Sequence, residues 1–164
     1  MANLEGLLER LVRHEVEFVV IGGYAAMAHG STYITLDVDV CTPLTGTNLE
    51  RIHAAFADLH PYHRMTPQEI PFTLPPDIGH GFKSVYLKTD LGQIDCLGSL
   101  TDVGDFEFTK AHSISMKLAF GECRFLDCPT LIHAKEIVGR PKDFLVAKQL
   151  RAILDANSPP ESNL

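Results

Sequence analysis

The sequence predicts an α/β (α+β) domain in which a small mixed β-sheet is flanked by helices. Short runs rich in β-branched residues alternate with stretches whose apolar residues recur at helical spacing, and turn residues separate the two kinds of segment. With 164 residues, of which 45% are hydrophobic and 21% charged, the chain is long enough for one domain with a substantial core. We therefore expect a single domain over residues 1–156 and a flexible polar tail over residues 157–164.

The expected elements follow from local patterns. Leucines at positions 4, 7, 8 and 11 predict an amphipathic opening helix. Further helices are expected over about 24–29, 47–59, 130–138 and 141–156, and strands over 17–21, 35–41, 82–88, 92–97, 105–109 and 122–127. Residues 60–81 contain several prolines and show no clear period, which is typical of an irregular, substrate-facing segment.

Composition and charge exclude several classes of protein. A net charge of -7 disfavours a surface built throughout to bind nucleic acid, although basic residues do gather between Lys135 and Arg151. No stretch reaches 18 apolar residues and the N-terminus is charged, so we predict a cytoplasmic protein without a membrane partner. The four cysteines form no CxxC pair, which favours buried thiols over a zinc site.

Two motifs near the N-terminus indicate phosphate chemistry. Asp37 and Asp39 alternate with apolar residues, so both carboxylates lie on one face of the expected strand and can share a divalent ion. Gly22 and Gly23 end the preceding apolar strand and open a helix, an arrangement that lets phosphate oxygens approach backbone amides. Each motif alone is also typical of an ordinary solvated strand or turn. Their combination favours a site that binds a metal and a triphosphate.

These residues resemble the DNA polymerase beta-type nucleotidyltransferase superfamily, in which a glycine pair precedes an Asp-x-Asp strand. The match, from Gly22 through His29, Gly30 and Thr35 to Asp39, is similar to small bacterial members related to abortive-infection and toxin–antitoxin nucleotidyltransferases. It extends to a C-terminal helix and to the run from Gly139 to Asp143. The resemblance covers roughly residues 15–150 and implies a nucleotidyltransferase fold.

The resemblance also implies a reaction and a set of site residues. A nucleoside triphosphate such as ATP would give its nucleoside monophosphate to a hydroxyl acceptor and release pyrophosphate, with Mg²⁺ or Mn²⁺ as cofactor. Asp95, in a later apolar strand, matches the third carboxylate of the family and would ligate metal and help take the acceptor proton. The implied catalytic and metal-binding residues are Asp37, Asp39 and Asp95, and the implied phosphate- or acceptor-binding residues are Gly22, Gly23, Thr35, Lys135, Arg140 and Lys142.

One departure from the family keeps alternatives open. Many relatives carry an arginine two residues before the threonine, where this chain has Tyr33. One alternative is therefore a degenerate nucleotide-binding module of the same fold. Another is the toxin of a toxin–antitoxin pair, which would act on RNA or protein and bind a cognate antitoxin. Small-molecule acceptors within this superfamily usually accompany an extra helical domain, for which the chain has little room. A calcium-binding protein is a remote alternative, because EF-hand spacing is absent.

Overall fold

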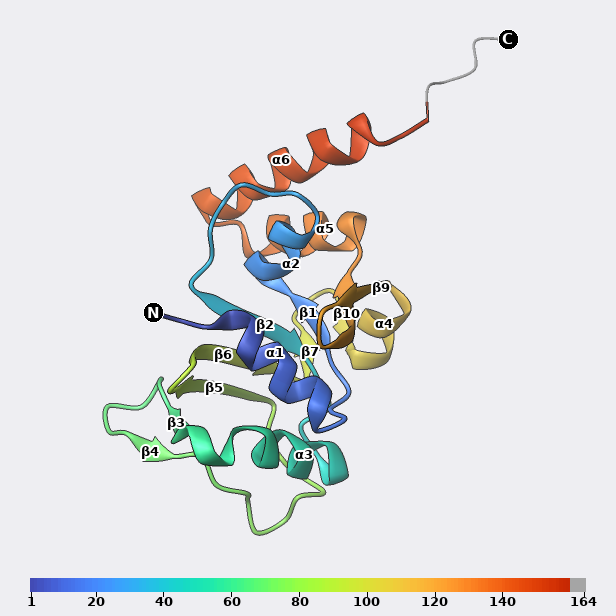
Figure 1. Ribbon diagram of the computed structural model, residues 1–164. Helices are drawn as coiled ribbons and strands as arrows, with labels where there is room; N and C mark the ends of the chain where they lie inside the picture. The colour runs from blue at the N-terminus through green and yellow to red at the C-terminus, as the bar shows by residue number, and fades with distance from the viewer. Residues whose placement is uncertain (160–164) are drawn as a thin grey trace.

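The core of the protein is an eight-stranded mixed sheet in the order β4-β3-β5-β6-β2-β1-β10-β9. This computed structural model describes residues 1–159. The two parallel pairs are β1 with β10 and β2 with β6, and the other neighbours are antiparallel. The predicted mixed sheet flanked by helices is confirmed (Figure 1). Its strands are β1 (Val19–Ile21), β2 (Asp37–Cys41), β3 (Tyr62–His63), β4 (Ile70–Pro71), β5 (Ser84–Thr89), β6 (Gly92–Leu97), β9 (Ser113–Leu118) and β10 (Gly121–Leu126).

Helices cover the sheet. They are α1 (Leu4–Arg13), α2 (Gly22–Ala28), α3 (Gly46–Phe56), α4 (Phe106–Ala111), α5 (Cys128–Val138) and α6 (Pro141–Ala156), with a 3-10 turn at Ala57–Leu59. Helix α1 buries its leucine stripe against β2, β6 and β10, and α3 packs beside it. Helix α5 packs on α2, and α6 lies outermost against α5 (Figure 1).

The C-terminal helices begin and end where local chemistry requires. The Asp127 carboxylate accepts the backbone N–H of Thr130 at 2.9 Å and caps the start of α5. Gly139 ends α5 with φ of 70°, in the left-handed region that glycine adopts without strain. Pro141 then opens α6, because its fixed φ suits a first helical turn. Two helices predicted from the sequence are thereby confirmed.

The predicted strand over residues 105–109 is wrong. A small two-stranded sheet, β7 (Ser99–Leu100) with β8 (Gly104–Asp105), ends at Asp105. The Asp105 carboxylate accepts the backbone N–H of Phe108 at 2.9 Å and starts α4. This capping bond starts a helix where a strand was expected.

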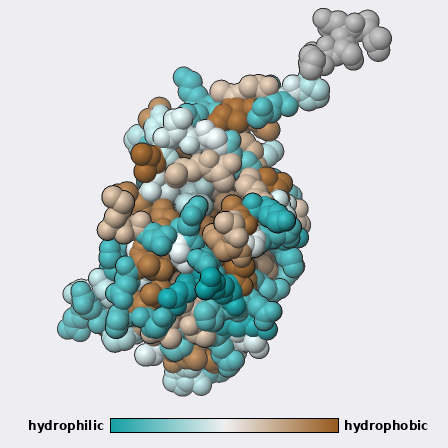
Figure 2. Space-filling view, in the orientation of Figure 1, coloured by the Kyte–Doolittle hydropathy of each residue, from teal (hydrophilic) through white to brown (hydrophobic). Residues whose placement is uncertain are grey.

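Other expectations have mixed outcomes. All four cysteines are buried, as predicted. Within residues 1–159, no helix combines the length and apolar character needed to cross a membrane. Figure 2 shows small groups of hydrophobic side chains interleaved with hydrophilic ones over the visible face. The domain range 1–156 stays a prediction, and residues 160–164 of the predicted tail lie outside the described residues.

Candidate metal and phosphate site

Two parallel strands bring three carboxylates together. Asp39 on β2 lies directly opposite Asp95 on β6. Asp37 shares the face of Asp39, because side chains repeat every second residue along a strand. One oxygen from each of the three carboxylates lies within 4.8 Å of the others. The structure thus brings together the three acidic residues that the sequence predicted.

The size of this cluster suits a divalent cation. Mg²⁺ binds oxygen ligands at about 2.1 Å in octahedral geometry, so neighbouring ligands lie about 3 Å apart and opposite ligands about 4.2 Å apart. Side-chain oxygens within 4.8 Å of one another reach these spacings when they approach by up to about 2 Å. Hard carboxylate oxygens are the ligands that magnesium and manganese prefer. The donor set and its spacing therefore fit such an ion.

Like charges and burial perturb the cluster. Burial, and then the negative charges of Asp37 and Asp95, raise the pKa of Asp39 from its ordinary 3.8 to about 7. Burial also raises the pKa of Asp95, although a hydrogen bond from Arg64 opposes that rise. A bound cation would favour the charged forms of both groups.

The glycine pair allows side chains to approach the start of α2. Gly22 has φ of 64°, and a Cβ there would clash with the Asp39 carboxylate. A Cβ on Gly23 would lie 2.9 Å from the Cβ of Thr35. Glycine is needed at both positions so that Asp39 and Thr35 can pack this closely.

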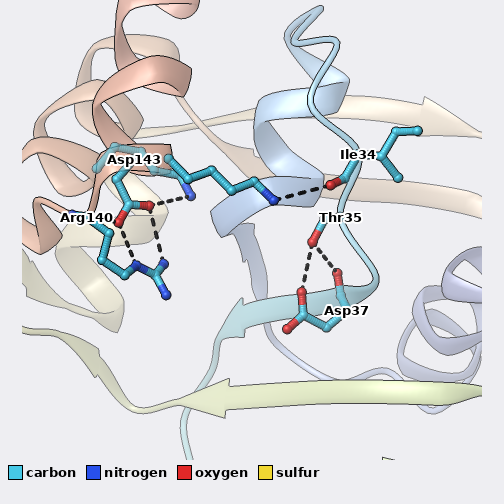
Figure 3. A network of polar contacts seen from close by, with 7 residues as sticks. Ile34, Thr35, Asp37, Arg140 and Asp143 are labelled. Carbon is cyan, nitrogen blue, oxygen red and sulfur yellow. Dashed lines mark hydrogen bonds and ion pairs between the residues drawn. The ribbon is translucent and has the colours of Figure 1, made fainter.

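Thr35 orients one of the acids. Its hydroxyl donates to the Asp37 carboxylate at 2.8 Å, as Figure 3 shows. This contact fixes the rotamer of Asp37 toward the cluster. The family resemblance implied a phosphate-binding role for Thr35, and that role stays a prediction.

Asp143 organises the predicted cationic residues. Its side chain is only 2% exposed and accepts from Arg140 Nε at 2.7 Å and from Lys135 Nζ at 3.4 Å (Figure 3). Burial opposes ionisation of Asp143, but the Arg140 hydrogen bond and the two positive charges outweigh it and lower its pKa. Lys142 instead donates to the backbone carbonyl of Ile34 at 3.4 Å. All three predicted cations line the same cavity as the acidic cluster.

A cavity of about 810 Å³ joins these groups. Eight of the nine predicted site residues line it, and Gly22 lines an adjoining hollow of about 210 Å³. The wall beside Lys142 is formed by the loop between α2 and β2, which includes Tyr33, Ile34 and Leu36. Helix α6 holds this loop: Gln149 accepts from the Ser31 hydroxyl at 2.7 Å and the Thr32 N–H at 3.0 Å.

Two residues of the site were not predicted from the sequence. Arg64, between β3 and β4, lines the cavity and forms an ion pair with Asp95 at 2.5 Å. It lies in the segment predicted to face substrate, but no periodic pattern singles it out. Gln149 acts through the loop, and its position within an ordinary helix carries no signal of that contact.

The fold matches that of solved nucleotidyltransferases. The lincosamide antibiotic adenylyltransferase LnuA, in its lincomycin-bound form, aligns with a TM-score of 0.58 and 13% identity over 93% of this chain and 98% of its own. TM1012 from Thermotoga maritima, a candidate nucleotidyltransferase, aligns with a TM-score of 0.54 and 18% identity over 93% and 90%. ANT(2")-Ia, in complex with adenylyl-2"-tobramycin, gives 0.51 and 14% over 93% and 92%. No family model and no curated protein matches the sequence. The protein therefore has a nucleotidyltransferase fold.

Proposed function

We propose that this protein is a metal-dependent nucleotidyltransferase that moves a nucleoside monophosphate from a nucleoside triphosphate to a hydroxyl acceptor. The convergence of Asp37, Asp39 and Asp95, with oxygens within 4.8 Å of one another, carries the proposal. The nucleotidyltransferase fold supports it. Asp37, Asp39 and Asp95 would hold Mg²⁺ or Mn²⁺, which when bound supplies positive charge to the reacting phosphate oxygens.

Other steps of the reaction would depend on side chains of the protein. The acceptor oxygen forms a bond to the α-phosphorus while the bond from that phosphorus to the bridging oxygen breaks and pyrophosphate leaves. Asp95 would take the acceptor proton. Lys135, Arg140 and Lys142 would neutralise the triphosphate, on the same side as Gly22, Gly23 and Thr35.

The cavity supports a small acceptor. Its volume of about 810 Å³ lies within the range of about 300–1,000 Å³ that is usual for small-molecule sites. Arg64, the cation beside Asp95, is already paired with that carboxylate, so an RNA phosphate would find little free positive charge there. LnuA, 98% of whose chain aligns with this one, is a lincosamide adenylyltransferase, so the expected need for an extra helical domain does not exclude a small molecule. The RNA or protein acceptor and the cognate antitoxin stay predictions.

Calorimetry tests the site first. Each of the four nucleoside triphosphates is titrated into the wild type with and without Mg²⁺, and then into Asp37→Asn/Asp39→Asn. We expect magnesium-dependent binding of at least one nucleotide, lost in the double variant and retained in Asp155→Asn, which changes an exposed carboxylate on α6. Failure of the folded wild type to bind any of the four would refute the proposal.

Pyrophosphate release tests the reaction. The nucleotide that binds is incubated with small hydroxyl compounds, including lincosamides and aminoglycosides, and separately with RNA. We expect release with a small compound and none from Asp95→Asn. Binding without release for every acceptor would favour the degenerate nucleotide-binding module, and release with RNA alone would favour the toxin alternative.

A further inference from the structure

Arg64 binds the carboxylate of Asp95 with two parallel hydrogen bonds. Its Nε donates to Asp95 Oδ1 at 3.1 Å, and its Nη2 donates to Asp95 Oδ2 at 2.5 Å. The two side chains are only 25% and 11% exposed. A bidentate contact fixes the plane of a carboxylate, which a single hydrogen bond does not.

Two contacts with Tyr86 hold Arg64 in place. Its backbone N–H donates to the carbonyl of Tyr86 at 3.0 Å, and its guanidinium carbon lies 5.5 Å from the centre of the Tyr86 ring. Tyr86 on β5 stands directly opposite Asp95 on β6. Arg64 is thus anchored to β5, the strand that pairs with β6, which carries Asp95.

We propose that Arg64 is a positioning residue that turns the Asp95 carboxylate toward Asp37 and Asp39. The inference rests on the proposed function of that cluster. A carboxylate has about four lone-pair sites, and the guanidinium uses two of them. The others remain free for a metal ion or an acceptor hydroxyl. A lysine would keep the charge but not the planar fork.

The effect of removing Arg64 on metal affinity separates a positioning role from two other roles. If Arg64 only added positive charge, or only blocked Asp95, its removal would tighten metal binding, because a nearby cation repels the ion. If it positions Asp95, its removal weakens binding, since partners that orient metal ligands typically contribute about 10–100-fold in affinity. The sign of the change separates the roles.

Calorimetric titration of Mn²⁺ into the full chain provides the test. We expect Arg64→Gln to bind Mn²⁺ about tenfold or more weakly than the wild type, and Arg64→Lys to bind more weakly too, despite its retained charge. Arg10→Lys and Arg10→Gln are the controls. Arg10 is 30% exposed and forms an ion pair of 2.5 Å with Asp58, which is not part of the cluster. Both control variants should match the wild type.

Two further variants complete the design. In an Asp95→Asn background, Arg64→Gln should have no additional effect if Arg64 acts through Asp95. Equal or tighter binding by Arg64→Gln, or wild-type binding by Arg64→Lys, would overturn the positioning role while leaving the proposed function intact. Absence of Mn²⁺ binding by the wild type would instead overturn the proposed function. If Arg64→Gln does not fold, as judged by circular dichroism, the comparison of Arg64→Lys with Arg10→Lys decides.

Discussion

Asp39 makes the stability of the metal-free protein depend on pH. Its pKa is about 7 in the folded chain, because of burial and then the charges of Asp37 and Asp95, against an ordinary 3.8. Between these values the folded chain binds a proton that the unfolded chain does not. The free energy of unfolding therefore rises as the pH falls from about 7 toward 4, by up to about 1.4 kcal/mol per pH unit. Above pH 7 the carboxylate is charged in both states and its destabilising effect is constant.

Asp39→Asn imitates the protonated side chain and removes this dependence. We expect the two proteins to match only below about pH 4, and the advantage of the variant to grow between pH 5 and pH 8 by up to about 3 kcal/mol, from the two pH units between 5 and 7. Urea unfolding in a metal chelator, followed by circular dichroism because the chain has no tryptophan, measures the difference. Excess Mg²⁺ at pH 8 should stabilise the wild type and not the variant.

Asp58→Asn is the control for this experiment. The hydrogen bond from Arg10 lowers the pKa of Asp58, so this group titrates below pH 4 in both states. Its difference in stability from the wild type should stay constant between pH 5 and 8. A similarly constant difference for Asp39→Asn would refute the reasoning about burial and like charge.

Three further substitutions test the surroundings of the site. Gly22→Ala should lower the urea midpoint more than Gly46→Ala, because both glycines have positive φ but a Cβ at Gly46 meets no atom within 4 Å; equal losses would contradict this. Asp143→Ala should destabilise by about 2–3 kcal/mol, because it removes the carboxylate that pairs with the partly buried ammonium group of Lys135, whose side chain is 14% exposed. Arg140→Ala should have a much smaller effect in the same assay, because that side chain is 71% exposed. Gln149→Leu should speed amide hydrogen exchange in the loop before β2 while α5 stays protected; unchanged loop exchange would show that other contacts hold the loop.

Local patterns predicted most of the fold. The alternation around Asp37, the leucine stripe of α1 and the signals at Gly139 and Pro141 each act within a few residues, so the sequence alone displays them. The segment after Asp105 was misread because a single capping bond chose helix over strand. Strand β9 was not predicted; it forms as the partner of β10, and that pairing is a tertiary contact.

The site residues likewise fall into those that the sequence reveals and those that depend on tertiary contacts. Gly22, Asp37 and Asp39 follow a short spacing, and the family resemblance supplied Asp95. Arg64 and Gln149 could not be found by either route, because their partners lie 31 and 118 positions away. Contacts of this range depend on strand order and helix docking, which the local pattern does not contain.

The ion pairs around the cluster indicate where a cation would compensate charge best. Arg64 neutralises Asp95, and Asp143 already balances part of the charge of Lys135 and Arg140. The attraction of Lys135 lowers the pKa of Asp39 but is outweighed by burial and by its acidic neighbours. Asp37 and Asp39 therefore keep most of the uncompensated negative charge, next to the glycine turn. A divalent ion there would relieve the repulsion between them.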